Sequence, residues 1–380
     1  MAGIYVHIPF CKQACTYCDF HFSTSMRNKQ NVLDALKKEA KMRVDYLGTE
    51  PIETLYFGGG TPSLLNAHEL TSILKSLREN YNFAHEIEFT YEANPDDLSA
   101  EKLNMLVENG VNRLSIGIQS FDDKYLEWMN RAHRSADSVA CVKRAHEAGI
   151  TNISIDLIYG LPNLEISQWK SEIDNALALG VTHISAYCLT VEPATALGFR
   201  VRKGTEKPVD DEAASQQFEV LIEKLAAAGF EQYEVSNFAR EGFYSKHNTS
   251  YWFGIPYLGL GPSAHSFKPA ERAWNVANNS RYIQKIEADE LPITSENLSL
   301  EDQFNEWVMT GLRTKWGLDI LGGTQRFKID LRTGNENLIE KLVQEKKAEL
   351  NNGIFRLTKR GFFLADGIAS EFFLVEENSK

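Results

Sequence analysis

The first half of the chain alternates repeatedly between short apolar, β-branched runs and longer stretches with helical period. The six expected strands are Ile4–Ile8, Thr54–Phe57, Ile87–Glu92, Arg113–Gln119, Asn152–Ile158 and His183–Leu189. The expected helices are Asn28–Leu47, Ala67–Asn80, Ala100–Asn109, Ala136–Ala148, Ile166–Leu179 and Asp211–Ala228. Strand–helix units in series require a parallel sheet with right-handed crossovers, so this order predicts an α/β fold.

Polar side chains end nearly every expected strand, and this pattern bears on how the sheet closes. An open, doubly wound sheet would concentrate functional residues at one switch point. A β/α barrel carries them at the carboxyl ends of many strands. Glu92, Gln119 and Asp156 lie in three different expected strands, near their ends. Each alone would be read as a cap or a salt-bridge partner, but together they favour a barrel-like closure around one polar ligand site.

The strand–helix rhythm stops after the sixth unit, so the rest of the chain needs other elements. We expect one more strand over 232–238 and an ordered functional loop over 240–275. Beyond them we expect helices over 301–313 and 336–351, and a short strand over 354–357 packed with a helix. The last part is therefore expected to be a small, mostly helical domain. The expected division of the chain is 1–235, 236–298 and 299–380.

Charge and hydropathy exclude several classes of protein. The net charge of −12 argues against broad nucleic-acid binding, which needs a basic surface. No apolar run is long enough to cross a bilayer, and the first residues lack the pattern of a signal peptide. We therefore expect a cytoplasmic protein. Its five cysteines, an odd number, also argue against a disulfide framework.

Three of the five cysteines lie within eight residues, as Cys11-x-x-x-Cys15-x-x-Cys18. Thiolates are the usual ligands of iron–sulfur clusters, and three of them on a four-iron cluster leave one iron open to a small molecule. Zinc is the alternative, but it would want a fourth ligand such as His7 or His21. The spacing therefore favours a cluster over zinc. The other two cysteines, in apolar runs, are expected to be buried structural thiols.

Three further features are ambiguous when considered alone. Gly58–Pro62 follows the second expected strand and allows a ligand to approach the backbone, or simply makes a tight turn. Arg131 could bind a carboxylate with its planar fork, or lie solvated at the surface. His247–Trp252, followed by Gly259–His265, could place a histidine and aromatic rings against a haem. The residues alone favour an ordered loop with a core histidine.

The segment from Tyr5 to Phe20 reads Tyr-Val-His-Ile-Pro-Phe-Cys-Lys-Gln-Ala-Cys-Thr-Tyr-Cys-Asp-Phe. It resembles the radical S-adenosylmethionine superfamily and, more narrowly, its coproporphyrinogen III oxidase-like branch, which contains the HemN and HemW groups. The segments 58–62, 115–121 and 156–162 match the same branch in order. This resemblance covers essentially the whole chain. It implies an α/β fold consisting of a partial (β/α)6 TIM-like barrel with a small, mostly helical C-terminal domain.

The same resemblance implies two cofactors. A [4Fe–4S] cluster would bind to Cys11, Cys15 and Cys18, and the amino and carboxylate groups of S-adenosylmethionine would chelate its open iron. An electron from the cluster would then cleave the sulfonium to a 5′-deoxyadenosyl radical. The S-adenosylmethionine contacts implied position by position are Tyr5, Tyr17, Gly59, Gly60, Thr61, Glu92, Gln119, Arg131 and Asp156. Cys188 and His265 match further contact positions less securely.

Two groups within the branch differ at positions that can be checked. Oxidases resembling HemN carry a fourth cysteine two residues after the third, where this chain has Phe20. The Cys-Asp-Phe ending and the His-Asn-x-x-Tyr-Trp motif are similar to those of HemW-type haem chaperones. On that resemblance the haem-binding candidates are His247, Asn248, Tyr251 and Trp252, and His247 is the best ligand candidate.

The HemW-type resemblance also implies the partners. They would be haem, haem-accepting proteins and an electron donor, with possible peripheral membrane association through partners and with no nucleic acid. Anaerobic oxidation of coproporphyrinogen III in porphyrin biosynthesis is the alternative function. The resemblance leaves enzymatic activity open, but turnover of coproporphyrinogen is not expected without the fourth cysteine.

Overall fold

The computed structural model describes residues 1–374, and six parallel strands placed in chain order form the centre of its main sheet. These strands are β1 (Ala2–Ile8), β2 (Ile52–Gly59), β3 (Phe83–Ala93), β4 (Arg113–Gln119), β5 (Asn152–Tyr159) and β6 (His183–Cys188). Each pairs in parallel with the next. All six expected strands are therefore present, each within a few residues of its expected bounds.

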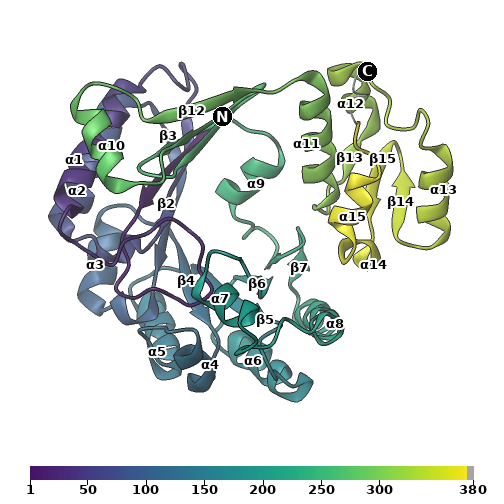
Figure 1. Ribbon diagram of the computed structural model, residues 1–380, viewed down its shortest axis with the longest axis horizontal. Helices are drawn as coiled ribbons and strands as arrows, with labels where there is room; N and C mark the ends of the chain where they lie inside the picture. The colour runs from purple at the N-terminus through teal and green to yellow at the C-terminus, as the bar shows by residue number, and fades with distance from the viewer. Residues whose placement is uncertain (375–380) are drawn as a thin grey trace.

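Helices cover the outer face of this sheet (Figure 1). They are α1 (Lys29–Met42), α2 (Ala67–Asn80), α3 (Ala100–Glu108), α4 (Asp123–Trp128), α5 (Ser135–Glu147), α6 (Ile166–Ala178) and α8 (Asp211–Ala227), with short 3-10 turns η1 (Pro62–Leu64) and η2 (Pro95–Asp97). Helix α7 (Ala196–Arg202) contacts the loop after β1 instead, where Leu197 N donates to Thr16 O at 2.8 Å. Apolar residues of the sheet and of these helices form one large core. The repeating unit of the chain is thus strand, loop, helix, as expected.

The barrel is open, because its first and last parallel strands pair with other elements. β1 pairs with β9 (Tyr257–Leu260), and β6 pairs with β8 (Asn237–Ala239), which pairs with β7 (Glu231–Gln232). The twelve strands of the sheet follow the order β12-β11-β10-β9-β1-β2-β3-β4-β5-β6-β8-β7. This arrangement confirms the predicted partial (β/α)6 barrel.

The segment expected to be a loop, 240–275, is instead built from a helix and strands. It contains α9 (Lys246–Trp252), β9, β10 (His265–Lys268) and β11 (Glu271–Asn275). After α10 (Asn279–Glu287), β12 (Ile293–Asn297) pairs antiparallel with β11 and forms the edge of the sheet, three strands beyond β9. The loop expectation was wrong because four- and five-residue strands carry little periodicity of their own. The single strand expected over 232–238 is also wrong, because β7 and β8 form an antiparallel pair.

A second core belongs to the C-terminal residues, which Figure 1 shows beside the barrel. The elements are α11 (Leu300–Leu312), β13 (Leu318–Asp319), α12 (Ile320–Phe327), α13 (Glu336–Gln344), β14 (Ala348–Asn351), β15 (Ile354–Leu357), α14 (Lys359–Phe362) and α15 (Ala365–Ser370). The helix expected over 336–351 ends at Gln344, because Lys346 takes a φ of 56° and the chain then forms β14. The last six residues of the expected domain 299–380 lie outside the described residues.

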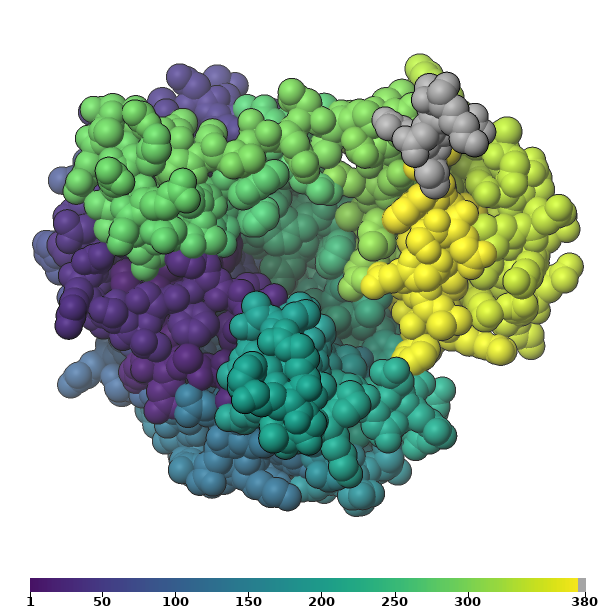
Figure 2. All heavy atoms as spheres, viewed as in Figure 1, coloured from purple at the N-terminus to yellow at the C-terminus, as the bar shows by residue number. Residues whose placement is uncertain are grey.

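Helix α9 lies between the barrel and the C-terminal part of the chain (Figure 1). Backbone bonds also join the two parts, since Val235 N donates to Arg313 O and Lys315 N donates to Tyr233 O. The space-filling view shows the surface hollowed between the barrel and the C-terminal residues (Figure 2). Within residues 1–374 no helix combines the length and the apolarity that a membrane span requires.

Candidate functional site

The loops at the carboxyl ends of the parallel strands surround a pocket of about 530 Å³. Residues from all six strand ends line it, which is the place where a β/α barrel carries its ligand site. Of the predicted cluster ligands and S-adenosylmethionine contacts, the pocket brings together Cys11, Cys15, Cys18, Tyr17, Gly59, Gly60, Thr61, Glu92, Gln119, Arg131, Asp156 and Cys188. The polar strand ends therefore converge on one site, as the sequence predicted.

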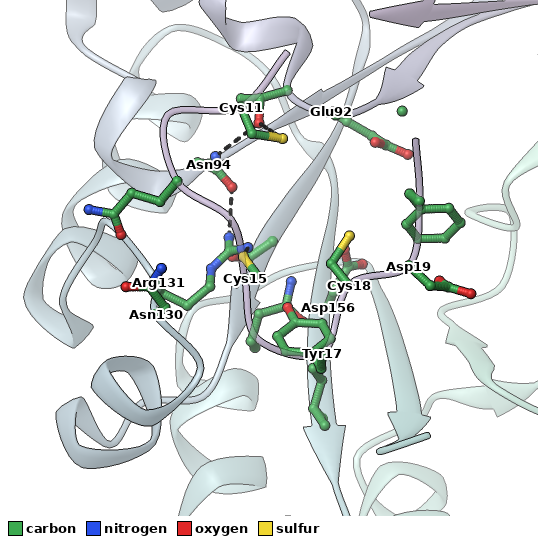
Figure 3. A pocket seen from close by; sticks show the side chains of 18 of the residues that line it. Cys11, Cys15, Tyr17, Cys18, Asp19, Glu92, Asn94, Asn130, Arg131 and Asp156 are labelled. Carbon is green, nitrogen blue, oxygen red and sulfur yellow. Dashed lines mark hydrogen bonds between the residues drawn. The ribbon is translucent and has the colours of Figure 1, made fainter. Parts of the chain in front are cut away.

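The three clustered cysteines lie around one space within this pocket (Figure 3). The Thr61 hydroxyl donates to Cys11 Sγ at 3.4 Å, and Arg131 Nη1 donates to Cys15 Sγ at 3.4 Å. Burial raises the pKa of the Cys11 thiol, and burial raises that of Cys18 to about 11. Donors directed at sulfur stabilise thiolates, which are the form that binds iron.

The donor set fits a multi-iron cluster better than a single ion. Among residues 1–374 no three His, Cys, Asp or Glu side chains are arranged to hold one metal ion. The two histidines considered as a fourth zinc ligand are bonded elsewhere, since His7 Nε2 is hydrogen-bonded to the His21 carbonyl at 2.9 Å and His21 Nε2 to Asn279 Oδ1 at 2.8 Å. Three thiols around a roomy pocket are the ligands that a [4Fe–4S] cluster with one open iron requires.

The loop that carries the cysteines is fixed to the barrel by polar contacts. Thr16 N donates to Met129 O at 3.0 Å, and Asn130 Nδ2 donates to Ala14 O at 2.8 Å. The Lys12 ammonium pairs with Asp96 at 2.7 Å. These contacts hold the loop over the ends of β3 and β4, so the positions of the thiols are set before any ligand binds.

The glycines of the second strand end are needed for space. Gly59 has a φ of +106°, and a Cβ there would lie 2.6 Å from the His7 ring. A Cβ on Gly60 would lie 2.7 Å from the Phe10 carbonyl oxygen. Neither position accepts a side chain without movement of β1 or the cysteine loop. The Gly58–Pro62 segment thus packs directly on the cysteine loop and exposes backbone to the pocket.

Two carboxylates enter the pocket from the barrel interior. Burial raises the pKa of Glu92 to about 7, although the Tyr56 hydroxyl donates to its Oε1 at 2.7 Å. Burial also raises the pKa of Asp156 to about 6, and the nearby Arg113 and Arg131 limit this rise. Both groups change charge close to neutral pH, which is typical of residues in ligand sites.

Arg131 is partly buried in the pocket wall and bonded to protein groups instead of being solvated at the surface. Its Nη2 donates to Asn94 Oδ1 at 2.6 Å and to Gly117 O at 2.8 Å, and its Nε has no partner among the described residues. Gln119 beside it takes a φ of 69°, an uncommon backbone conformation that holds its side chain at the end of β4. Asn94 was missed from the sequence, although it directly follows β3 as the other polar residues follow their strands.

Tyr5 and His265 lie outside the pocket lining. Tyr5 is inside the barrel, with its hydroxyl 3.3 Å from His7 Nδ1, and His265 stacks on Trp274 with a ring-centroid distance of 6.1 Å. Cys188 lines the pocket and is exposed, so its expectation as a buried structural thiol was wrong. Cys141, by contrast, is fully buried.

The haem-binding candidates lie together on α9, away from the cysteine pocket. His247 is 1% exposed, with Nδ1 bonded to Thr54 Oγ1 at 2.8 Å and Nε2 bonded to the Tyr251 hydroxyl at 2.8 Å. Burial, and secondarily the charge of Arg113, lowers its pKa to about 3. Asn248 donates its backbone N–H to Ser245 Oγ, and Trp252 Nε1 is buried without a partner among the described residues. His247 is thus a neutral, fully bonded core histidine in this conformation.

Comparison with family models matches both parts of the chain. Residues 5–175 match the radical SAM superfamily, and residues 298–364 match the HemN C-terminal domain. Coproporphyrinogen III oxidase (HemN) from Escherichia coli, a solved structure, has a similar fold with a TM-score of 0.85 and 23% sequence identity. This match covers 98% of this chain and 90% of that one.

Curated relatives match the chain from end to end. Heme chaperone HemW from Bacillus subtilis is 34% identical over 98% of this chain and 99% of its own length. Heme chaperone HemW from Lactococcus lactis is 33% identical over 98% of both chains. Radical S-adenosyl methionine domain-containing protein 1 from mouse, a mitochondrial protein, is 37% identical over 76% of this chain and 65% of its own. The chain therefore belongs to the HemW family of the radical S-adenosylmethionine superfamily.

Proposed function

We propose that this protein is a haem chaperone that binds haem and passes it to haem-dependent acceptor proteins. The observation that carries the proposal is identity of 33–34% over nearly the full length of relatives named heme chaperone HemW. Fold alone would not distinguish this function, because coproporphyrinogen III oxidase shares the fold. An electron donor for the cluster, and acceptors that lie at a membrane, belong to the same proposal.

Phe20 supports a chaperone over an oxidase. It occupies the position at which oxidases resembling HemN carry a fourth cysteine, and its 69%-exposed side chain lines the pocket. A phenyl ring cannot ligate iron or exchange a proton. It offers instead an apolar surface at the pocket rim, which suits contact with a flat hydrophobic ligand.

Membership of the radical S-adenosylmethionine superfamily implies a [4Fe–4S] cluster and S-adenosylmethionine. We assign the cluster to Cys11, Cys15 and Cys18, the thiols that line the pocket together with the Gly58–Pro62 segment. When bound, the two cofactors supply one-electron chemistry at a sulfonium centre.

The residues of the chain bind and orient the sulfonium ligand. Glu92 and Asp156 present carboxylates to ribose hydroxyls or to the cationic groups of the ligand. Arg131 directs its fork toward the pocket and Cys15, where a ligand carboxylate would sit beside the open iron. Gly59 and Gly60 expose backbone groups to the same space. Tyr17, Thr61, Gln119 and Cys188 line the same pocket and complete the proposed contact set, whereas Tyr5 and His265 lie outside the lining and are left out of it.

Haem would contact α9, where His247, Asn248, Tyr251 and Trp252 are the candidates. In the conformation described here both ring nitrogens of His247 are already bonded, to Thr54 and Tyr251. Ligation of iron therefore requires that α9 shift and that Tyr251 leave Nε2. A short helix between two separately packed cores is suited to such a movement.

The test is haem binding and transfer by the anaerobically reconstituted protein. Titration with haem should give a shifted Soret band, and an apo-acceptor such as an apocytochrome should then gain haem spectroscopically. Absence of binding at micromolar haem would refute the proposal. An anaerobic assay with a reductant, S-adenosylmethionine and coproporphyrinogen III covers the alternative, since sustained protoporphyrinogen formation would assign an oxidase instead.

A further inference from the structure

Arg113 is a fully buried cation in the middle of the barrel. It begins β4, is 1% exposed, and its Nε has no hydrogen-bond partner among the described residues. Within the same part of the chain its guanidinium forms no direct ion pair. Arg43, the other arginine that is buried to this degree among the described residues, forms a direct pair with Glu39 at 3.4 Å. A buried arginine without direct partners costs several kcal/mol unless nearby charges compensate for its desolvation.

The strand register places Arg113 directly below the ligand pocket. Side chains two residues apart share one face of a strand, so Arg113 and Ser115 both face the barrel interior, and Ser115 lines the pocket. Ser115 is opposite Glu92 on β3 and opposite Ser154 on β5. Asp156 lies one inward-facing position beyond Ser154. Arg113 thus lies on β4 between the two strands that carry the pocket carboxylates, one inward-facing position below the level of Glu92 and two below that of Asp156.

The other titratable groups around this position do not offer a better counter-charge. Besides the two pocket carboxylates, the charge of Arg113 acts on Tyr56, His183, Tyr233 and His247. The buried acids nearest to it are Glu88, two residues before the residue opposite Arg113 on β3, and Glu234, next to Tyr233. The carboxylate of Glu88 is hydrogen-bonded at the start of α9, where it accepts the backbone N–H groups of Lys246 and His247. Glu234 is bonded to Asn237 and to the Ser236 N–H. Glu92 and Asp156 remain as the carboxylates whose ionisation Arg113 favours.

We propose that Arg113 is a positioning residue, the buried counter-ion that favours the charged forms of Glu92 and Asp156 at the S-adenosylmethionine site. It need not touch the ligand, because in a low-dielectric interior a charge acts over several ångströms. The ligand is a cation at its sulfonium and ammonium groups, so charged carboxylates bind it more strongly than protonated ones. This inference rests on S-adenosylmethionine binding, which the family implies, and is independent of the proposed haem function.

The decisive measurement is the pH profile of S-adenosylmethionine affinity. The reconstituted holoprotein is titrated with S-adenosylmethionine by calorimetry between pH 5.5 and 9, as wild type, Arg113→Gln and Arg113→Lys. In Arg113→Gln the loss of the positive charge raises the pKa of both carboxylates, by about one unit or more. We expect about tenfold weaker binding at pH 7, with recovery to near wild-type affinity by pH 9. Arg113→Lys should keep the wild-type profile.

If Arg113 only stabilised the fold, its replacement would not shift the pH dependence of S-adenosylmethionine affinity. Arg43→Gln is the matched control, since it also removes a buried guanidinium but lies on α1, bonded to Glu39, Gly259 and Ser266. It should lower the melting temperature and leave the pH midpoint of binding unchanged. An Arg113→Gln profile that coincides with wild type, or an equal shift in Arg43→Gln, overturns the proposal.

A second measurement, of folding stability, needs no ligand and still tests the proposal if Arg113→Gln does not fold. The Arg113→Gln/Asp156→Asn double variant buries neither charge, so it should be more stable than the sum of the two single changes predicts. If Arg113→Gln alone is unfolded, the double variant should regain the wild-type circular dichroism spectrum. Additive losses, or a double variant that is also unfolded, would show that the two residues are not coupled.

Discussion

The hydroxyl of Tyr251 and the Nε2 atom of His247 form a hydrogen bond of 2.8 Å within helix α9. Thr54 Oγ1 bonds to the opposite ring nitrogen at 2.8 Å. In the tautomer with its proton on Nδ1, His247 donates to Thr54 and accepts from Tyr251. Histidines that bind metals commonly donate their second N–H to a neighbour in this way. Tyr251 would therefore compete with iron for Nε2, while Thr54 would orient the ring.

The competition predicts opposite effects for two substitutions. His247→Ala should weaken haem binding by about tenfold or more, because the axial ligand is removed. Tyr251→Phe should strengthen it several-fold, since Nε2 loses its competing donor and a hydrogen bond is typically worth about 1 kcal/mol. Soret titrations of the two variants and wild type measure both effects.

Thr249→Val is the matched control for these titrations. Thr249 lies on the same helix, and its buried Oγ1 has no partner among the described residues, so its loss should leave haem affinity unchanged. Wild-type affinity in His247→Ala would place the haem ligand elsewhere in the chain.

Glu92 should make the ligand-free protein lose stability as the pH rises. Burial raises its pKa from 4.5 to about 7, so the folded state prefers the protonated form. Its favourable contribution is complete below pH 4.5 and is lost as the pH rises through about 7. Glu92→Gln removes this dependence and keeps an acceptor for the Tyr56 hydroxyl. The variant should gain about 3 kcal/mol relative to wild type between pH 4.5 and 8, as measured by urea unfolding.

The exposed Glu86 on the same strand supplies the control for this pH series. Glu86→Gln should give the same difference from wild type at every pH. If the difference in unfolding free energy between Glu92→Gln and wild type does not change with pH, Glu92 is ionised in the folded protein at no cost in stability. The raised pKa of Glu92 would then be wrong.

The six-strand barrel and most of its site could be predicted because their signals are local. β-Branched runs and helical periods mark β1 to β6, and the polar residues at their ends share one edge because parallel strands point the same way. Gly59 shows this well. Its place in a glycine run predicted either the approach of a ligand or a tight turn, and the structure adds a reason that the sequence did not show, which is the His7 ring 2.6 Å from a Cβ.

Features that depend on tertiary pairing could not be predicted. β9 is four residues long, and its strand character comes from pairing with β1, which lies about 250 residues earlier in the chain. Cys188 lies in an apolar run that suggested burial, but β6 ends there and exposes it to the pocket. Nothing in the sequence indicated that Arg113 would be buried. A charged residue at the start of a strand is usually solvated, and only the tertiary packing of the barrel interior buries it.

Glu39 should be a strong determinant of stability, because it joins α1 to the edge of the sheet. Its carboxylate accepts from Gly261 N at 2.9 Å, Asn275 Nδ2 at 2.7 Å and the Tyr282 hydroxyl at 2.6 Å, and pairs with Arg43. Glu39→Ala leaves the buried guanidinium without its counter-ion, so we expect a loss of about 3–5 kcal/mol in chemical denaturation.

Asp34→Ala is the control on the same helix. Asp34 forms an exposed pair with Lys37, and such pairs contribute under about 1 kcal/mol. Similar losses for the two variants would mean that the Glu39 network adds no more than a surface ion pair.

Each of the three pocket cysteines should be required for iron, and the other buried thiol should not. Cys11→Ala, Cys15→Ala and Cys18→Ala each remove one of only three protein ligands, so anaerobically reconstituted variants should lose most of their iron, their sulfide and the broad visible absorbance. Cys141→Ala is the matched control, because Cys141 donates to Ser138 O inside α5 and does not line the pocket. It should keep wild-type iron content.

Metal analysis of the same preparations tests zinc as the alternative. One zinc per chain without sulfide would assign the thiols to zinc, whereas four iron and four sulfide per chain assign them to a cluster. The geometry favours the second result. Thr61, after β2, and Arg131, after α4, direct donors at Cys11 and Cys15. The three thiols line one pocket, and among the described residues they do not converge on a point where a single ion could bind.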